Sequence, residues 1–553
     1  MAKKEKHQAT AQATSKAATL QKGNQSDLFD KINGWFEKNE KLVFYSFLLL
    51  STLFSYLLFD AKVSDGLDDS SYIERAWSFA NEGKYPYFQG PGYPVFLSIF
   101  IKLFGLNVIA LKSFSVICQL GFVWMTYKTF VKRIPFTVLF ALLAFISFND
   151  FIQFYSSQTF TETFFLLVQS ICLYITFKIM DSIDPKLSWV DGFKQNYMKW
   201  ILFGLMFVLL SISKSVAFVT IVGVFVYFIF NKNYKQAVYA FIAFFAIRLI
   251  YQWITTAMFG ANDANQLEMM LRKELYKPAA GHEDFSGMLS RFYDNCVTYF
   301  SLHVYRILHL RPLKYDITSF VPFFAFLTSL FIGIVSFISY KRNKFIFFTS
   351  IYLVVLCGGI FFGVQAANMQ DRLIIIAMPF IFLLFFYGAY EFAKRYAGFQ
   401  GVFVAVAIGM LGWTILCSVG RMKENAKEGY TPDYDNFLKM SKYCADSLPA
   451  DAQVLSRKPA MSFIYGNGKK FVGQFVTTSM NPDTVMMGWK KQNIKYVIIA
   501  NLRMDPKKNN KKIINTIHRM LGPIINDPKY RGKVKLVKTI GTNEKCDLFE
   551  INY

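Results

Sequence analysis

Two adjacent carboxylates, Asp68 and Asp69, open a hydrophilic stretch that directly follows the first long apolar run of the chain. They come just before a segment with helical spacing of apolar residues, which predicts an amphipathic helix over residues 71–82. A carboxylate at the edge of an apolar medium can take the proton of a hydroxyl nucleophile, so both are candidate general bases. The alternative is that one of them caps the helix, although Ser71 and Glu74 already have the spacing of a capping box.

Three further charged residues, Glu162, Lys214 and Arg372, lie at the ends of apolar runs. A charge at membrane depth is costly, which makes each a candidate for function. Glu162 could assist the base, while an ammonium and a planar guanidinium could hold a phosphate group. The alternatives are that Glu162 is favoured by a helix dipole, that Lys214 snorkels to the interface, and that Arg372 simply pairs with Asp371.

The composition places these residues in a membrane protein. Of the 553 residues 54% are hydrophobic and 18% are charged, against about 25% charged residues in an ordinary globular domain. This excludes a soluble enzyme, a disordered chain, collagen and a coiled coil. The net charge of +24 would suggest nucleic acid on a soluble protein, but here many Lys and Arg flank apolar runs, as membrane-topology signals do. We therefore expect a membrane and no nucleic acid.

Apolar runs of about 20 residues, the length that spans a bilayer as a helix, recur along the chain. They lack the two-residue alternation of a barrel strand, so the expected fold is an all-α polytopic bundle of about eleven transmembrane helices. The runs are residues 41–60, 95–128, 135–149, 160–180, 198–213, 215–231, 236–258, 317–339, 345–363, 373–391 and 401–420.

The distribution of Lys and Arg among the short connections predicts the orientation. Residues 1–40 form a basic cytoplasmic segment, and residues 41–420 form the transmembrane core. Two large hydrophilic loops, residues 61–94 and 259–316, lie outside the cytoplasm together with the tail, residues 421–553.

The tail alternates helical and strand patterns, which predicts a soluble extracytoplasmic α/β domain. Helices are expected over residues 435–447 and 484–492, and strands over residues 452–456 and 496–500.

The first outer loop resembles that of the membrane glycosyltransferases of the GT-C fold, in the branch of protein O-mannosyltransferases and the aminoarabinose transferase of lipid A. The resemblance implies a polyprenyl-phosphate sugar as donor and transfer at the outer face of a bacterial inner membrane. It rests on Asp68-x-x-x-Tyr72, Gly83-x-x-Pro86-Tyr87, Pro91-Gly92-Tyr93-Pro94, Leu103-Phe104-Gly105 and, in the tail, the segment from Val454 to Pro459.

The resemblance also implies roles for single residues. Asp68 matches the loop aspartate of the family and is the expected general base of an inverting transfer. One departure is that Gly90-Pro91 stands where the lipid A enzyme has Lys-Pro. The expected site is therefore catalytic Asp68, Asp69 and Glu162, with Asp68 and Glu162 also sharing a divalent Mg or Mn ion; donor-phosphate-binding Lys214, Arg372 and Arg75; and substrate-binding Tyr72, Tyr93 and Gln89.

The acceptor is expected to be a hydroxyl of a glycolipid such as lipid A, of a surface glycan or of a protein. Two other functions are weighed against the transferase. A transporter or flippase of lipid-linked sugars predicts repeated halves with broken helices, and the sequence has no such repeat. In a non-catalytic assembly protein Asp68 and Glu162 would be helix caps, and their replacement by Ala would leave function intact.

Overall fold

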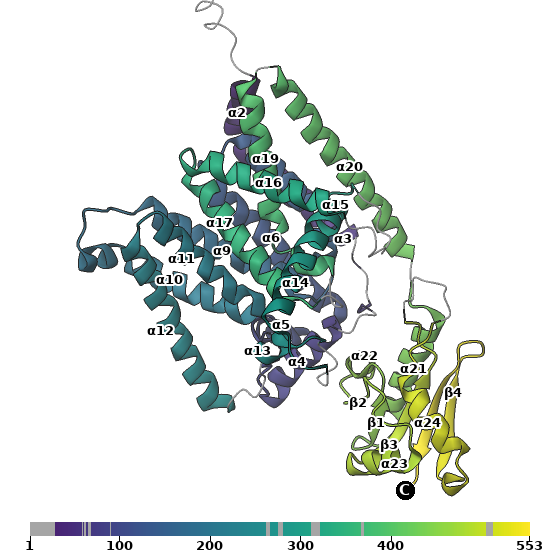
Figure 1. Cartoon of the computed structure of the whole chain (residues 1–553). Coiled ribbons are helices and arrows are strands. Elements are labelled where there is room, and N and C mark those ends of the chain that lie inside the picture. Colours follow the sequence, from purple (N-terminus) through teal and green to yellow (C-terminus); the bar gives the residue numbers. More distant parts are fainter. Residues whose placement is uncertain are drawn as a thin grey trace, which may run out of the picture.

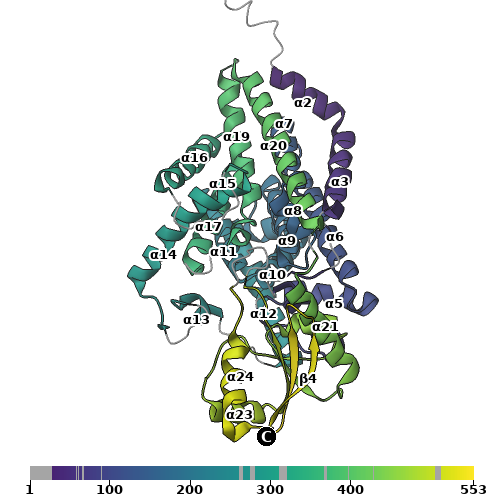
Figure 2. The same cartoon turned by 90° about the vertical axis from the view of Figure 1, so that its right-hand side faces the viewer.

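The computed structural model of the chain contains a helical bundle with a small α/β unit at one end (Figures 1 and 2). The two are joined by α20, a long helix that runs along one side of the bundle. The described residues are 28–57, 59, 62–64, 68–88, 90–260, 266–274, 280–310, 321–365, 370–396, 398–427, 429–504 and 512–553.

The first half of the bundle begins with two helices that lie at the amino-terminal edge and continues with the helices that carry most of the candidate residues. In chain order these elements are α2 (Leu28–Lys38), α3 (Glu40–Leu57), α4 (Asp68–Glu82), α5 (Gly92–Phe104), α6 (Val108–Phe130), α7 (Phe136–Phe148), α8 (Asp150–Ser156), α9 (Thr161–Asp181), α10 (Trp189–Ser213), the 3-10 turn η1 (Ser215–Ala217), α11 (Phe218–Phe230) and α12 (Tyr234–Phe259).

The second half contains shorter pieces before its long helices, including one π-helical turn. These elements are α13 (Gln266–Leu271), α14 (Phe285–Thr298), the π-helix η3 (Tyr299–His303), α15 (Val304–Ile307), α16 (Pro322–Tyr340), α17 (Lys344–Gly363), α18 (Asp371–Ile374), α19 (Met378–Arg395) and α20 (Phe399–Lys427).

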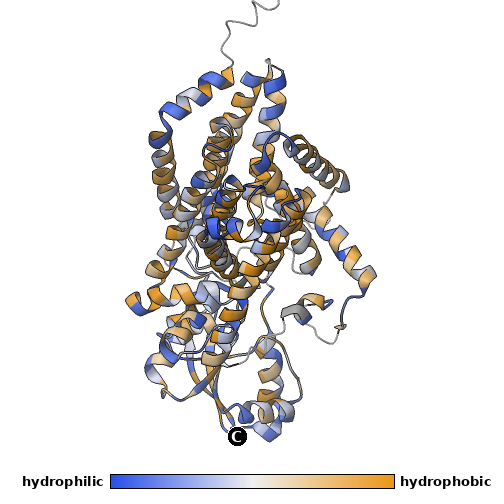
Figure 3. Cartoon of the chain, turned by 90° about the vertical axis from the view of Figure 1, so that its left-hand side faces the viewer, coloured by the Kyte–Doolittle hydropathy of each residue, from blue (hydrophilic) through white to orange (hydrophobic). Residues whose placement is uncertain are grey.

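The bundle has the character of a membrane domain, and hydrophobic residues dominate its long helices (Figure 3). Among the residues that the structure describes, eight helices are long and apolar enough to cross a membrane, or nine if α7 and α8, which meet at 57°, form one broken span. The apolar windows of α3, α12 and α20 are each only 17% buried, so most of their side chains face outward, whereas that of α9 is 78% buried. The chain is a multi-pass membrane protein with α9 near its centre.

Each of the eleven predicted runs contains helix in the structure, while residues 58, 60 and 317–320 of two runs lie outside the described residues. The run 95–128 divides into α5 and α6, with a break at Gly105, whose φ is +61°. The runs 135–149 and 215–231 contain helices shorter than a full span, because α7 and α11 each have 13 residues. The all-α polytopic fold is confirmed, and the number of crossings stays a prediction.

The helix predicted over residues 71–82 begins earlier, at Asp68. The capping-box interpretation of Ser71 and Glu74 is therefore wrong, because both lie within α4. Its apolar side chains, among them fully buried Ile73 and Ala76, pack against α5 and, in the α/β unit, α22 (Pro459–Tyr465). Protein therefore covers a face that was expected to lie on the membrane interface.

The α/β unit has a five-stranded sheet of order β2-β1-β3-β5-β4. β1 runs parallel to β2 and β3, while β5 runs antiparallel to β3 and β4. The remaining elements are β1 (Gln453–Ser456), β2 (Val472–Gly473), β3 (Ile494–Ala500), β4 (Val534–Ile540), β5 (Cys546–Ile551), α21 (Pro432–Ser447), α23 (Pro482–Lys491), α24 (Thr516–Asn526) and the 3-10 turn η6 (Pro528–Tyr530).

Neighbouring residues of β1 face opposite sides of this sheet, as the strand alternation requires. Val454 belongs to the hydrophobic cluster that contains residues of α21 and α22. Leu455 belongs to a second cluster, which contains residues of α23 and α24. The helices therefore cover both faces of the sheet.

Candidate active site

Four charged side chains from distant segments form one continuous chain of ion pairs. Arg372 of α18 contacts two carboxylates, with Nη1 on Oδ2 of Asp68 and Nε on Oε1 of Glu162. Lys214, between α10 and η1, places Nζ 2.6 Å from the same Oε1 of Glu162. The ion pairs thus link Asp68, Arg372, Glu162 and Lys214 in that order.

The two ends of this chain differ in their exposure to solvent. The side chain of Glu162 is 0% exposed, and those of Lys214 and Arg372 are 12% and 14% exposed, whereas that of Asp68 is 43% exposed. Burial lowers the pKa of Lys214, and the neighbouring Glu162 carboxylate opposes this change. A buried carboxylate is stable only when it is paired, so Glu162 anchors the cations and Asp68 is the carboxylate that another molecule can reach.

Local structure explains why these side chains meet. Glu162 lies in the first turn of α9, where the helix dipole favours a carboxylate. Lys214 has an extended backbone at the break between α10 and η1, which turns its side chain away from the helix axis. The guanidinium of Arg372 lies over the ring of Phe160, 4.7 Å from its centroid.

Buried polar atoms surround Glu162 and lack a hydrogen-bond partner among the described residues. They are the second carboxylate oxygen of Glu162 itself, Oε1 of Gln158, and the hydroxyls of Thr159, Thr161 and Thr163. A buried polar group without a partner is costly. A segment with this many unpartnered polar groups is typical of a site that receives a polar ligand. In the sequence this segment is visible as a polar run between two apolar runs.

A close backbone contact brings the first outer loop against Lys214. Gly90 has φ +93°, and a Cβ at this position would lie 2.6 Å from the carbonyl oxygen of Ser213. A side chain at this position would therefore require the backbone of Ser213 to shift.

Arg372 does not take Asp371 as its partner, which answers the alternative left open by the sequence. Asp371 instead contacts Nδ1 of His303 and lies 3.1 and 3.2 Å from Nη1 of Arg306. Although burial raises the pKa of Asp371, these two partners leave it below its usual value. His303 ends the π-helical turn, a feature that often occurs at functional sites. Both His303 and Arg306 fall within the hydrophilic loop that the sequence predicted over residues 259–316.

Asp69, expected to share catalysis, is fully buried. Its oxygens accept hydrogen bonds from the backbone N–H of Ser64 at 2.6 Å, from the Ser64 hydroxyl at 2.9 Å and from the backbone N–H of Ser70 at 2.8 Å. Burial raises the pKa of Asp69. The geometry corrects the prediction, because a carboxylate enclosed in this way fastens the start of α4 and does not reach a substrate.

The aromatic candidates separate into two groups. Tyr72 is buried beside the ion-pair chain, and the guanidinium of Arg75 lies 4.7 Å from its ring centroid. Arg75 also donates from Nε to the backbone carbonyl of Ser71 at 3.0 Å and from Nη1 to that of Phe88.

Tyr93 is fully buried behind Tyr72, with its hydroxyl 3.2 Å from that of Ser115. Its predicted contact with substrate is corrected to a packing role, because it supports the ring of Tyr72 from within the core. Gln89, the other expected substrate residue, lies outside the described residues.

The residues present do not fit the divalent ion that was expected between Asp68 and Glu162. The guanidinium of Arg372 occupies the position between the two carboxylates, and Lys214 adds a second positive charge. Among the described residues, no group of three or more His, Cys, Asp or Glu could hold a metal ion. Within this geometry Arg372 and Lys214 supply the positive charge.

The comparisons with known proteins concern the fold. No protein-family model and no curated protein sequence matches this chain. ArnT from Cupriavidus metallidurans bound to undecaprenyl phosphate is similar in structure, with a TM-score of 0.54 and 10% identity over 91% of this chain and 97% of ArnT. In its apo state the TM-score is 0.53 at 12% identity, over the same shares of the two chains.

A second similar structure is the Archaeoglobus fulgidus oligosaccharyltransferase tethered to an acceptor peptide with the NVT sequon. Its TM-score is 0.52 at 12% identity, over 84% of this chain and 70% of that one. The same archaeal enzyme in complex with Zn and sulfate has a TM-score of 0.51 and 13% identity, over 82% and 67%. At these identities the likeness concerns architecture, and the chain therefore has the GT-C fold of membrane glycosyltransferases.

Proposed function

We propose that this protein is an integral membrane glycosyltransferase that moves a sugar from a polyprenyl-phosphate donor to a hydroxyl of an extracytoplasmic acceptor. The observation that carries the proposal is the chain of four charges, whose cations are buried and whose outermost carboxylate, Asp68, is exposed. The GT-C fold supports it, and so does the undecaprenyl phosphate bound to the similar ArnT.

Arg372 and Lys214 are assigned to the donor phosphate, and Asp68 to the acceptor. In the ion-pair chain Arg372 holds Asp68, so the carboxylate is occupied while this pair is intact. A donor phosphate competes for the same guanidinium through two oxygens. Binding of the donor thus releases Asp68 to contact an acceptor hydroxyl.

The proposed transfer is a single step in which one bond forms as another breaks. Asp68 takes the proton of the acceptor hydroxyl, whose oxygen forms a bond with the anomeric carbon as the bond from that carbon to the phosphate oxygen breaks. The leaving polyprenyl phosphate carries the negative charge that Arg372 and Lys214 neutralise. Glu162 is buried and held by both cations, so it is not free to act as a nucleophile, which favours inversion.

The polar segment around Glu162 is assigned to the sugar. Its hydroxyls at Thr159, Thr161 and Thr163 have no partner among the described residues, and they could bind the hydroxyl groups of a sugar. Candidate acceptors are a glycolipid such as lipid A, a surface glycan and a protein.

The proposed location is a bacterial inner membrane, with residues 1–40 in the cytoplasm, residues 41–420 as the catalytic core, and residues 421–553 outside. The α/β unit lies at one end of the bundle (Figures 1 and 2), where its α22 contacts α4, the helix that begins with Asp68.

The test is to incubate the purified protein with radiolabelled polyprenyl-phosphate sugars and a membrane extract, and to compare wild type with Asp68→Asn. We expect Asp68→Asn to lose roughly 10²–10⁴-fold in transfer rate, the usual contribution of a general base. The matched control is Glu391→Gln, which removes a carboxylate that pairs with Arg342 and should keep full activity. Equal label in the wild type and Asp68→Asn samples would remove Asp68 from catalysis.

A further inference from the structure

An apolar groove lies between the last two helices of the bundle, at the end away from the α/β unit (Figures 1 and 2). Its walls are side chains of α19, from Phe385 to Ala393, and of α20, from Phe399 to Met410, and all of them are Phe, Ala, Val or Met. The groove measures about 210 Å³, whereas about 10–15 Å³ is enough to hold one water. It therefore has room for a length of hydrocarbon chain, and its lining side chains offer water no hydrogen bond.

The groove follows α20 for about the depth of one leaflet. Between Phe399 and Met410 this helix rises about 16 Å, at about 1.5 Å per residue, and the hydrocarbon core of a bilayer is about 30 Å thick. The groove also opens sideways, because the lining residues Phe392, Val402 and Val406 are between 50% and 54% exposed. An acyl chain that enters from the bilayer and lies alongside α20 therefore fits the groove along its length.

Aromatic side chains surround the mouth of the groove, where α19 ends and α20 begins. Phe392 packs edge to face on Phe399 with 5.5 Å between ring centroids, and the ring of Tyr396 lies 5.2 Å from that of Phe392 and 6.2 Å from that of Phe399. Tyr396 is exposed, and tyrosine is enriched at the boundary between hydrocarbon and water. The mouth of the groove therefore lies at the level of the lipid head groups.

Two cations lie at this mouth, at the end of the helix that forms one wall. Lys394 and Arg395 directly follow Ala393, the last lining residue of α19. Both are exposed, and neither forms an ion pair with any residue that the structure describes. The acidic residue just before them, Glu391, is paired with Arg342 at 2.7 Å. Basic residues at a membrane surface attract anionic lipid head groups.

We propose that the groove between α19 and α20 binds one bilayer lipid with an anionic head group, in the leaflet remote from the α/β unit. Its acyl chain lies between the two helices, and Lys394 and Arg395 bind its phosphate. The charge argues against a second copy of the chain as the occupant, because two copies in the same membrane orientation bring the cations of both together. This lipid site is separate from the ion-pair chain around Arg372 and does not depend on transfer chemistry.

Native mass spectrometry of the full-length protein in detergent tests the proposal, because it counts bound lipids. The probes are phosphatidylglycerol, which is anionic, and phosphatidylcholine, which carries no net charge, with identical acyl chains. We expect a single phosphatidylglycerol to bind roughly 30-fold more tightly than phosphatidylcholine, which is about fivefold for each cation.

Two variants test whether the lipid lies in the groove. The double variant Lys394→Gln and Arg395→Gln should abolish the preference for phosphatidylglycerol. Ala407→Phe fills the groove, because Ala407 lines it, and should weaken the binding of both lipids roughly tenfold, the equivalent of about two buried methylene groups. The matched control is the double variant Lys186→Gln and Lys194→Gln, which removes two exposed cations near the start of α10 and should leave both affinities unchanged.

Equal affinities of the wild type for the two lipids would overturn the proposal, without any need for a variant to fold. A preference for phosphatidylglycerol that persists in the double variant at Lys394 and Arg395 and in Ala407→Phe would place the lipid elsewhere and would also overturn it. A wild-type dimer that retains no lipid and that Ala407→Phe converts to monomers would assign the groove to a contact between copies instead.

Discussion

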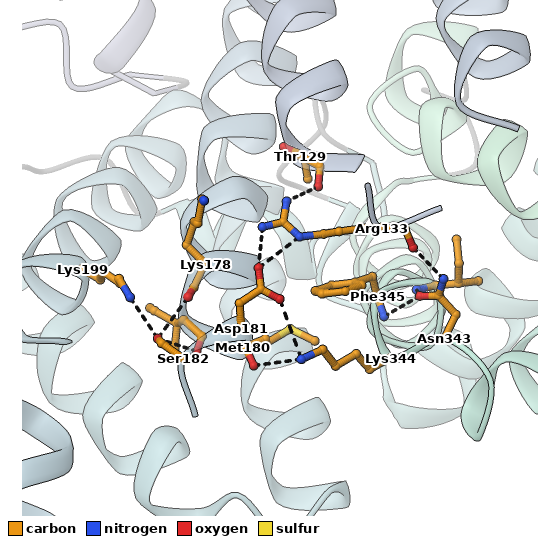
Figure 4. Close-up of polar contacts among 12 residues, drawn as sticks. Thr129, Arg133, Lys178, Met180, Asp181, Ser182, Lys199, Asn343, Lys344 and Phe345 are labelled. Carbon is orange, nitrogen blue, oxygen red and sulfur yellow. Dashed lines mark hydrogen bonds and ion pairs between the residues drawn. The ribbon is translucent and has the colours of Figure 1, made fainter. Parts of the chain in front are cut away.

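The two ends of helix α9 each carry a carboxylate paired with cations, and they use those cations in opposite ways. At the far end Asp181 contacts Arg133 at 2.6 Å and Lys344 at 3.8 Å. Figure 4 shows that both cations also reach backbone carbonyls, Arg133 that of Thr129 and Lys344 that of Met180.

At the end of α9 that contains Glu162, the ion pairs of Arg372 and Lys214 go to the carboxylates of Asp68 and Glu162, and buried acceptors nearby have no partner among the described residues. Cations bound to the main chain hold helices together, whereas cations bound only to side chains can exchange them for a ligand. Ion pairs by themselves therefore do not identify a site; the partners of each donor do.

The largest expected effect is on catalysis at the Glu162 end of α9. Arg372→Gln removes the group that links both carboxylates and is assigned to the donor phosphate. We expect the transfer rate to fall about 10²–10³-fold, the usual cost of losing one such electrostatic contact. Arg133→Gln, at the other end of α9, should stay close to wild type. Equal losses in the two variants would show that both clusters are structural.

The second largest difference is expected in the free energy of unfolding, when each of the two carboxylates of α9 is replaced by its amide. Glu162→Gln leaves Lys214 and Arg372 buried without Glu162, and we expect a loss of about 3 kcal/mol in the free energy of unfolding. Asp181→Asn, whose side chain is 39% exposed in the wild type, should cost about 1 kcal/mol or less. Thermal unfolding in detergent measures both.

Undecaprenyl phosphate should raise the melting temperature of Glu162→Gln more than that of wild type, because the phosphate replaces the missing charge. If the lipid has no effect on either protein, the two cations do not bind phosphate.

Gly90→Ala tests how the first outer loop keeps Lys214 in place. The added Cβ would lie 2.6 Å from the Ser213 carbonyl, so we expect the donor concentration for half-maximal rate to rise roughly tenfold, which corresponds to about 1.4 kcal/mol. Gly83→Ala is the control for strain, because Gly83 also has a positive φ, +68°, but nothing lies within 4 Å of its Cβ. An equal effect of both variants would exclude the contact with Ser213 as the cause.

The smallest effect is expected at Asp371, which touches neither donor nor acceptor and positions Arg372 through the backbone. Asp371→Asn should lower the maximal rate severalfold with little change in acceptor affinity. Because His303 and Arg306 hold the pKa of Asp371 below its usual value, its contribution is present above that usual value and is lost as the pH falls through the lowered pKa. Glu391→Gln, which removes the partner of Arg342, is the control and should keep the wild-type pH profile.

The sequence predicted the elements with strong periodicity and missed those without it. β1, β3, α21 and α23 lie within a few residues of their expected bounds, because buried strands and amphipathic helices repeat apolar residues at fixed spacing. β4 was missed because its side chains are mostly exposed and include lysines. α24 was missed although its apolar residues recur at helical spacing, because Pro523 inside it indicates a break.

For the site, the sequence identified the charged residues at the ends of apolar runs but did not predict which of them form ion pairs with each other. Asp68 and Arg372 are 304 positions apart, and no spacing rule relates residues so distant. The same limit explains Asp371: its neighbour Arg372 was the obvious partner along the chain, whereas the fold supplies His303 and Arg306. Asp69 was misjudged because its enclosure by Ser64 depends on how the loop folds back.

The contact between α4 and α22 joins the membrane bundle to the α/β unit. Trp77 of α4 packs edge to face on Phe463 of α22 with 5.2 Å between ring centroids, and Glu82 pairs with Lys470. A chain shortened at the end of α20 would uncover this face of the helix that presents Asp68. The shortened protein should then lose the alignment of Asp68 while its spans still insert, so we expect the proposed transfer activity to require the tail.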